Sequence, residues 1–137
     1  MRLKLYLDTS VLGAVCDPGP EDRLAATRRI LDGLRAGSWD GYISALVLEE
    51  VSRAHDSVRR KIATVLDKSP VTVLDESQES VALAHAYIAA GAIPSDYEDD
   101  ARHIAIATLN DINVLDLAPG PRHRAGRRLK RSLSSLR

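Results

Sequence analysis

The chain has 137 residues, 45% of them hydrophobic and 28% charged, with a formal net charge of zero. This length and balance predict one soluble globular domain with its own buried core. No apolar run reaches the roughly 18–20 residues of a membrane span. The first acid comes too early for a signal peptide, and Cys16 alone can form neither an internal disulfide nor a cysteine-based zinc site. A cytoplasmic protein that makes no contact with a membrane is expected.

The neutral net charge conceals a basic end. The stretch "PRHRAGRRLKRSLSSLR" (121–137) holds seven Lys/Arg residues and no acid, which leaves 12 basic and 19 acidic residues in 1–120, a net charge of −7. The hydrophobic pattern also stops after Ala118. The sequence therefore predicts a folded domain at 1–118 and a basic, flexible tail at 119–137. Such a tail either grips phosphates or is simply a solvated end.

The first half of the chain alternates short apolar runs with amphipathic stretches. Leucines at every second position predict a strand, whereas apolar residues spaced by three or four predict helices. Pro and Gly clusters mark loops, and a glycine directly after a helix is typical of a C-cap. The expected elements are a strand at 3–7, a loop at 17–23, a helix from about 21 to 36 closed by Gly37, a strand at 41–44, a helix at 45–55 capped by Ser44, and a helix at 58–68.

The second half continues the alternation of strands and helices. Its expected elements are a strand at 71–74 after Pro70, a helix at 76–91 closed by Gly91, a helix at 100–111, and a strongly apolar strand at 112–117. Strands separated by helices predict an α/β fold whose central parallel sheet, of about four strands, is flanked by helices on both faces. In such sheets ligands bind beyond the carboxyl ends of the strands.

Several acids stand where an apolar pattern would otherwise continue. Asp8 directly follows the first strand, at its carboxyl end. Glu50 comes four residues after Leu46 and so falls on the buried stripe of its helix, while Glu49 lies about 100° around the same helix, a position that predicts exposure. Asp8 and Glu50 are therefore candidates for a functional site at the edge of the sheet.

Asp99 and Asp100 open a late helix that is otherwise rich in Ala and Ile. A purely structural explanation is available for both: Asp99 as the N-cap and Asp100 as a first-turn acid that the helix dipole favours. His103 follows Asp100 by three residues and shares its helix face. It either touches RNA or supports a ligand, or it is a buried, hydrogen-bonded histidine.

Three carboxylates that converge at one sheet edge need a counter-charge. Like charges about 4 Å apart repel by roughly 4 kcal/mol at an effective dielectric near 20, so a fold keeps such a cluster only with a cation or a shared proton. Hard oxygen ligands with open positions suit Mg²⁺ or Mn²⁺. Such a site activates a water and stabilises the charge that builds on a phosphodiester.

The three acidic stretches also carry a family resemblance. "YLDTSVL", "ISALVLEEV" and "DDARHIAIAT" resemble, in order and spacing, the acidic motifs of PIN-domain proteins, the VapC-type toxin ribonucleases and their small prokaryotic relatives. The resemblance covers residues 3 to about 115. It implies a three-layer PIN-like fold and a Mg²⁺- or Mn²⁺-dependent site in which Asp8, Glu50 and Asp100 are catalytic and hold the metal, while Thr9 or Ser10 supports the first carboxylate or a metal-held water.

The chain departs from the family pattern after its last strand. The polar stretch that usually follows this strand is missing from "VLDLAPGPRHRAGRR", and Asp116, the nearest acid, stands one or two positions early. Asp116 is thus a candidate fourth metal contact. The resemblance implies a metal-dependent endoribonuclease whose substrate is RNA. It also implies a toxin that binds an antitoxin partner or forms a homodimer. The alternative is a degenerate PIN domain that binds RNA or a protein partner without cleaving.

Two other classes of α/β protein, which also carry their functional residues directly after the first strand, fit the sequence less well. A phosphatase that forms an aspartyl-phosphate commonly needs a second Asp two residues after the first, and Ser10 occupies that position. A dinucleotide-binding domain needs a glycine-rich loop after its first strand, and none follows residue 7.

Overall fold

The structure is a computed structural model, and it describes residues 2–16 and 21–115 of the chain. Its centre is a sheet of four strands in the order β3-β2-β1-β4, and every neighbouring pair is parallel. The strands are β1 (Leu3–Leu7), β2 (Trp39–Ser44), β3 (Val71–Leu74) and β4 (Asn113–Leu115). The α/β fold with a central parallel sheet, which the alternation of elements predicts, is confirmed.

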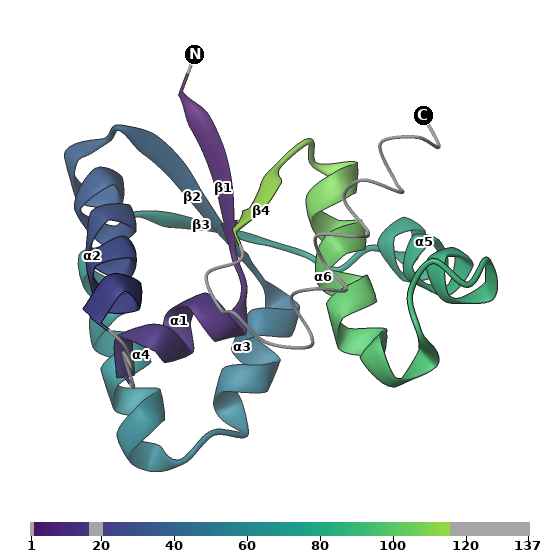
Figure 1. The fold of residues 1–137 in the computed structure, drawn as a ribbon, viewed down its shortest axis with the longest axis horizontal. Helices are drawn as coiled ribbons and strands as arrows, with labels where there is room; N and C mark the ends of the chain where they lie inside the picture. Colours follow the sequence, from purple (N-terminus) through teal and green to yellow (C-terminus); the bar gives the residue numbers. More distant parts are fainter. Residues whose placement is uncertain (1, 17–20, 116–137) are drawn as a thin grey trace.

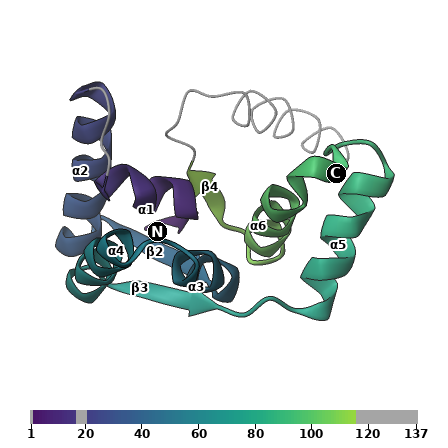
Figure 2. The ribbon, with the colours of Figure 1, turned by 90° about the horizontal axis from the view of Figure 1, so that it is seen from below.

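Helices cover both faces of this sheet, as Figures 1 and 2 show. The connections β1 to β2 to β3 run in one direction across the sheet, and β4 lies on the opposite side of β1. Because such crossovers are right-handed, the helices of the first two connections gather on one face and those of the third on the other. The first group comprises α1 (Thr9–Cys16), α2 (Glu21–Ala36), α3 (Ala45–Ser52) and α4 (Asp56–Lys68); the second comprises α5 (Gln78–Ala89), the 3₁₀ turn η1 (Ser95–Tyr97) and α6 (Glu98–Leu109).

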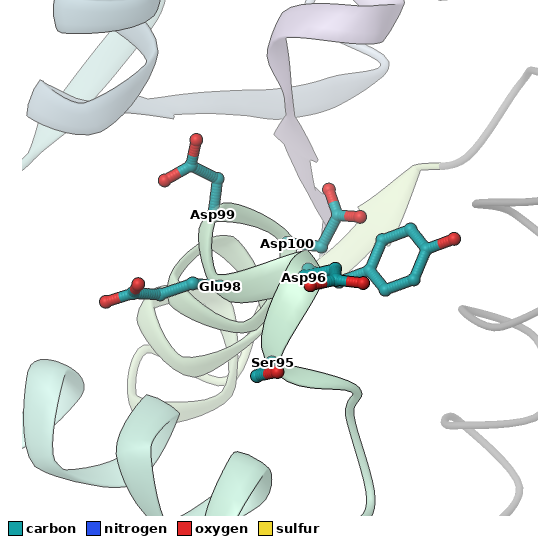
Figure 3. Close-up of a pocket in the computed structure, with 6 residues that line it drawn as sticks. Ser95, Asp96, Glu98, Asp99 and Asp100 are labelled. Carbon is teal, nitrogen blue, oxygen red and sulfur yellow. The ribbon is translucent and has the colours of Figure 1, made fainter.

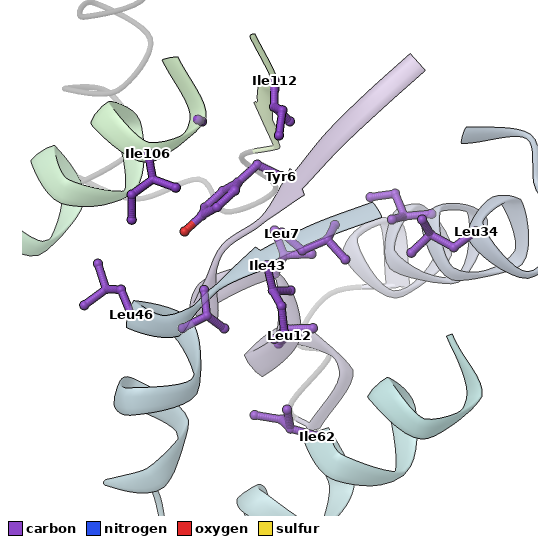
Figure 4. Close-up of a cluster of buried hydrophobic side chains, with 13 residues drawn as sticks. Tyr6, Leu7, Leu12, Leu34, Ile43, Leu46, Ile62, Ile106 and Ile112 are labelled. Carbon is purple, nitrogen blue, oxygen red and sulfur yellow. The ribbon is translucent and has the colours of Figure 1, made fainter. Parts of the chain in front are cut away.

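The main core lies on both faces of β1 and β2 (Figure 4). Leu7 and Ile43 point to the side of α1, α2 and α4, whereas the Tyr6 ring points the other way, toward α6. Burying side chains of this size stabilises the fold by about 1.5–3 kcal/mol each. The largest fully buried side chains of this cluster are Tyr6, Leu7, Leu12, Leu34, Ile43, Ile62, Ile106 and Val47.

A second, smaller cluster joins α5 to α6. It consists of Ala84, Tyr87, Ile93, Ala101 and Ala105. Helix α6 therefore packs through two faces, one on the sheet and one on α5, and α5 reaches the rest of the molecule mainly through α6. This arrangement leaves α6 buried on two sides, which explains its run of Ala and Ile.

Most of the expected elements occur within a few residues of their expected bounds, but the pattern does not indicate α1. This helix starts immediately after Asp8, with no loop between strand and helix. Its sequence, TSVLGAVC, combines β-branched residues with a glycine, a composition of low intrinsic helix propensity. The helix is stabilised instead by the Asp8 cap and by the burial of Val11 and Leu12 in the core.

The expected division into a domain at 1–118 and a basic tail at 119–137 falls largely outside the described residues, as does Asp116. Across residues 2–16 and 21–115, no helix combines the length and the apolar character that crossing a membrane requires.

Candidate active site

The topology itself marks one edge of the sheet as the place for a ligand. The chain leaves β1 toward β2 on one side and returns to β4 on the other, so the order of connections reverses between β1 and β4. In open α/β sheets ligands bind outside the carboxyl ends of the strands at this reversal. Asp8 follows the carboxyl end of β1, and α6 leads into β4. The reversal thus brings Asp8 to the edge that α6 borders.

Asp8 is held at this edge by the start of α1. Its Oδ1 accepts hydrogen bonds from Ser10 Oγ at 2.7 Å and from the backbone N of Val11 at 3.0 Å. Ser10 is therefore the hydroxyl that supports the first carboxylate. The Thr9 Oγ1 atom is buried and has no hydrogen-bond partner within the described part of the chain. The edge thus combines a carboxylate whose orientation is fixed with an unsatisfied hydroxyl beside it.

Glu50 comes to the same region from α3, whose N-cap is Ser44, as expected from the sequence. Glu50 Oε1 is hydrogen-bonded to His103 Nε2, and the other ring nitrogen, Nδ1, is hydrogen-bonded to the Tyr6 hydroxyl at 2.7 Å. The Tyr6 hydroxyl also shares a hydrogen bond of 2.7 Å with Ser44 Oγ. His103 is only 5% exposed. Of its two interpretations, the buried, hydrogen-bonded histidine is confirmed.

Burial and nearby negative charges both raise the pKa of the Tyr6 hydroxyl. Burial raises its pKa well above the usual range, a hydrogen bond to Ser44 acts in the opposite direction, and the negative charges of Asp8, Glu50 and Glu76 raise it further. Tyr6 therefore stays protonated. Glu50 is joined to Tyr6 through His103, and Asp8 follows Tyr6 by two residues, directly after β1.

Asp99 and Asp100 both fall in the first turn of α6. The expectation that Asp99 is the N-cap is wrong, because the 3₁₀ turn η1 leads into the helix and moves its start to Glu98, with Tyr97 at the cap. Figure 3 shows Asp99 and Asp100 directed to one side of the helix and Glu98 to another. Asp100 is half-buried and Asp99 exposed. A pocket lies at the start of α6, and the residues that line it are Ser95, Asp96, Tyr97, Glu98, Asp99 and Asp100.

An arginine that the sequence pattern does not single out organises the acids next to this site. Arg102 donates to both carboxylate oxygens of Glu76, from Nε at 2.7 Å and from Nη2 at 2.5 Å. It also lies 3.3 Å from Asp99 and 4.0 Å from the exposed Glu49. The hydrogen bonds from Arg102 hold the pKa of the Glu76 carboxyl below its usual range. Arg102 thus ties α6 to the loop after β3 and to α3.

Replacing Arg102 with methionine is expected to lower the free energy of unfolding by about 1–2 kcal/mol at neutral pH, because a partly buried Glu76 loses both of its donors. A lowered pKa in the folded state means that this stabilisation is present above the ordinary carboxyl pKa and is lost as the pH falls through the folded value. Urea unfolding measured from pH 7 to pH 3 should therefore show a shallower pH dependence in Arg102→Met than in the wild type.

The matched control for that variant is Arg53→Met. Arg53 pairs with Glu49, but both side chains are largely exposed, at 67% and 48%. Exposed pairs contribute about 0.5 kcal/mol or less, so this variant should unfold almost as the wild type does. Equal losses in the two variants would show that Arg102 acts only as a surface charge.

The oxygen ligands available at this edge of the sheet suit a hard divalent cation. The candidate ligands Asp8, Glu50 and Asp100 offer carboxylate oxygens, and the buried hydroxyl of Thr9, next to Asp8 in the chain, has no hydrogen-bond partner within the described residues. Within the described residues, no three His, Cys, Asp or Glu side chains are already grouped to hold an ion. An ion bound here would keep several water ligands, as Mg²⁺ usually does in protein sites.

Together, the fold and this edge define a class: a small α/β domain with carboxylates at the switch point of a parallel sheet. The chain aligns with the structure "VapBC2 from Rickettsia felis bound to a DNA fragment from their promoter" at 15% identity and a TM-score of 0.59, covering 83% of this chain and 87% of that one. It aligns with the sarcin-ricin loop cleaving toxin VapC20 of Mycobacterium tuberculosis at 18% identity and a TM-score of 0.58, covering 82% and 89%.

These likenesses establish the fold. The chain has the PIN-domain fold of VapC proteins, and the resemblance that its three acidic stretches carry is confirmed at the level of the fold. Neither a protein-family model nor a curated protein matches the sequence.

Proposed function

We propose that this protein is a metal-dependent endoribonuclease of the VapC toxin kind. The observation that supports the proposal is the hydrogen-bonded connection of Glu50 through His103 to Tyr6, which stands two residues before Asp8 at the end of β1, in a VapC-like fold. Asp100 belongs to the same proposed site because it stands one helical turn before His103, the partner of Glu50.

In this proposal the chain's own residues position the reaction. Ser10 and the start of α1 fix Asp8 through Oδ1, so that Oδ2 would be the oxygen offered to an ion. His103 fixes Glu50 through Oε1. A bound Mg²⁺ or Mn²⁺ supplies Lewis-acid stabilisation of the phosphodiester charge and lowers the pKa of a bound water. Asp8, Glu50 and Asp100 would hold it, and Thr9, next to Asp8 in the chain, would support a water of the ion.

The deciding experiment is an RNA cleavage assay with purified protein. Structured and unstructured RNAs are incubated with Mn²⁺, with Mg²⁺ and with a chelator, and the products are mapped at nucleotide resolution. We expect discrete cuts with either ion and none with the chelator. RNA that is bound in a mobility-shift assay but stays intact in every condition would contradict the enzymatic proposal and support the degenerate, RNA-binding alternative.

The same proposal extends to assembly. The Rickettsia felis neighbour is VapBC2 bound to a DNA fragment from its promoter, and by this likeness we propose that the chain acts with an antitoxin partner. We also propose, from the family resemblance of the acidic stretches, that the chain forms homodimers. Light scattering of the purified chain tests the second point. Toxicity on expression in a bacterial host, relieved by a co-expressed partner, tests the first.

Millimolar Mn²⁺ is expected to raise the melting temperature of the protein by several degrees. A cation that binds the native state alone stabilises it by about 2.7 kcal/mol at a concentration a hundred times its Kd, and here it also relieves repulsion between carboxylates. Differential scanning fluorimetry measures the shift. Asp8→Asn/Asp100→Asn should abolish it, whereas Asp32→Asn/Asp67→Asn, which removes two exposed helix acids, should retain it. A shift that survives in the first double variant would place the ion elsewhere.

A further inference from the structure

The four hydrogen-bonded side chains behind the candidate site form one continuous path. It runs from Ser44, at the start of α3, through Tyr6 on β1 and His103 on α6 to Glu50 on α3. Ser44 and Tyr6 are fully buried and His103 nearly so. Only Glu50, at the end of the path, is partly open to solvent. The path thus leads from the interior to a carboxylate at the edge of the sheet.

The two ends of the path favour one direction for the hydrogen bonds in it. At one end the backbone N of Val47 can only donate, and it donates to Ser44 Oγ at 3.3 Å. At the other end the carboxylate of Glu50 is the acceptor when His103 Nε2 is the donor. If Ser44 donates to Tyr6 and Tyr6 to His103 Nδ1, every buried donor and acceptor along the path is satisfied.

The opposite direction leaves a buried proton without an acceptor. If His103 Nδ1 donated to the Tyr6 oxygen, Tyr6 would donate to Ser44, whose own hydroxyl proton would then have no acceptor in the described part of the chain. An unsatisfied buried donor costs about 1–3 kcal/mol. The raised pKa of Tyr6 agrees with a phenol that keeps its proton and donates it. The direction from Ser44 to Glu50 is therefore favoured.

We propose that Ser44, Tyr6 and His103 are positioning residues that occupy Oε1 of Glu50, so that this carboxylate offers only Oε2 to a bound ion. The proposal rests on the proposed function, because it assigns the ion to Glu50. It deepens that function by predicting which ion the site prefers. A carboxylate with one free oxygen binds in the monodentate mode, which an octahedral Mg²⁺ or Mn²⁺ accepts, whereas Ca²⁺ gains from bidentate carboxylates. The histidine therefore disfavours Ca²⁺.

The test compares the Kd of Mn²⁺ with that of Ca²⁺ by isothermal titration calorimetry. Removing a partner that orients a metal ligand commonly weakens metal binding by about 10–100-fold. In His103→Leu, where Glu50 is free to turn, we expect Mn²⁺ to bind about tenfold more weakly and Ca²⁺ to lose much less, so that the preference for Mn²⁺ falls about tenfold. His103→Gln, which can still donate to Glu50, should keep the preference within about threefold of the wild type.

The preference is a ratio, so a general loosening of the fold does not imitate the expected result. Equal losses for both ions in His103→Leu, or a preference in His103→Gln that falls as far as in His103→Leu, would overturn the proposal. Tyr87→Phe, which removes a hydroxyl from the buried cluster between α5 and α6, is the matched control and should leave both Kd values unchanged.

A second measurement tests the direction of the hydrogen bonds in the path, in the protein without any bound ion. Long-range ¹H–¹⁵N NMR spectra of the wild-type protein, assigned with the help of His103→Gln, give the tautomer of His103. We expect a proton on Nε2 and none on Nδ1. A proton on Nδ1 alone would overturn the path. Failure of the wild type to bind either ion would overturn the metal dependence and the ion preference, and the tautomer would then still show whether the path positions Glu50.

Discussion

Asp8→Asn is expected to lower the rate of metal-dependent RNA cleavage by roughly a thousandfold while the chain stays folded. The loss follows from removing a charge that helps to hold an ion worth several kcal/mol to the transition state. The fold should persist because the asparagine carbonyl can accept the same bonds from Ser10 and Val11 that Asp8 accepts now, and Asn caps helices as well as Asp does. Single-turnover cleavage and urea unfolding measure the two effects.

Asp67→Asn is the control for this variant. Asp67 is an exposed acid near the end of α4, so the same change of one charge should leave the cleavage rate within about twofold, because exposed charges are screened over about a Debye length. If Asp8→Asn cleaved RNA as fast as the Asp67 control does, Asp8 would be no more than the N-cap of α1.

Several features of the fold follow from the sequence because their physics is local. Ser44 and the glycines at the helix ends act on backbone atoms a few residues away: Ser44 accepts from the N of Val47, and Gly37 and Gly91 adopt positive φ angles of 74° and 71°. The expected strand at 41–44 is two residues longer in the structure, since Trp39 and Asp40 pair with Leu3 and Lys4. That extension depends on register, which only the folded sheet defines.

The partners within the candidate site depend on long-range contacts, so spacing along the chain does not indicate them. The hydrogen bonds of His103 join residues 53 and 97 positions apart, to Glu50 and to Tyr6. The Arg102–Glu76 pair spans 26 positions. For Glu50 and His103 the sequence did carry a signal, a polar residue within an otherwise apolar helix, whereas it carried none for Arg102 and Glu76. What it lacked was any indication of which polar residue would meet which.

The acids themselves could be singled out because each interrupts an apolar pattern at the end or start of an element. Glu50 connects through His103 to Tyr6, two residues before Asp8, and the convergence of Asp8 and Glu50 on one ion stays a prediction. Asp100 lies in the first turn of α6, as its position in the sequence indicates, and its membership of a shared metal site stays a prediction. The distinction between Thr9 and Ser10 needed the structure, because both hydroxyls stand within two residues of Asp8 and only the helical turn decides which one reaches Oδ1.

Gly33→Ala is expected to destabilise the protein by about 3 kcal/mol. This is the opposite of the usual effect, because alanine in a helix interior is more stable than glycine by about 1 kcal/mol. Gly33 is buried in α2, and a Cβ there would overlap the Cζ2, Cε2 and Cη2 atoms of the Trp39 ring. The ring cannot simply turn away, because its Nε1 donates to the Ile30 carbonyl at 3.0 Å. The overlap therefore forces either a shifted helix or a lost hydrogen bond, and thermal and urea unfolding measure the loss.

Two further variants separate this close contact from the general effect of the substitution. Gly13→Ala makes the same change inside α1, where a Cβ would meet nothing within 4 Å, so it should stabilise the protein by about 0.5–1 kcal/mol. In a Trp39→Leu background the overlap disappears, and Gly33→Ala should then cost almost nothing, which gives a coupling energy of about 2–3 kcal/mol in the double-mutant cycle. If Gly33→Ala cost the same with and without Trp39, the glycine would be required by something other than the indole ring.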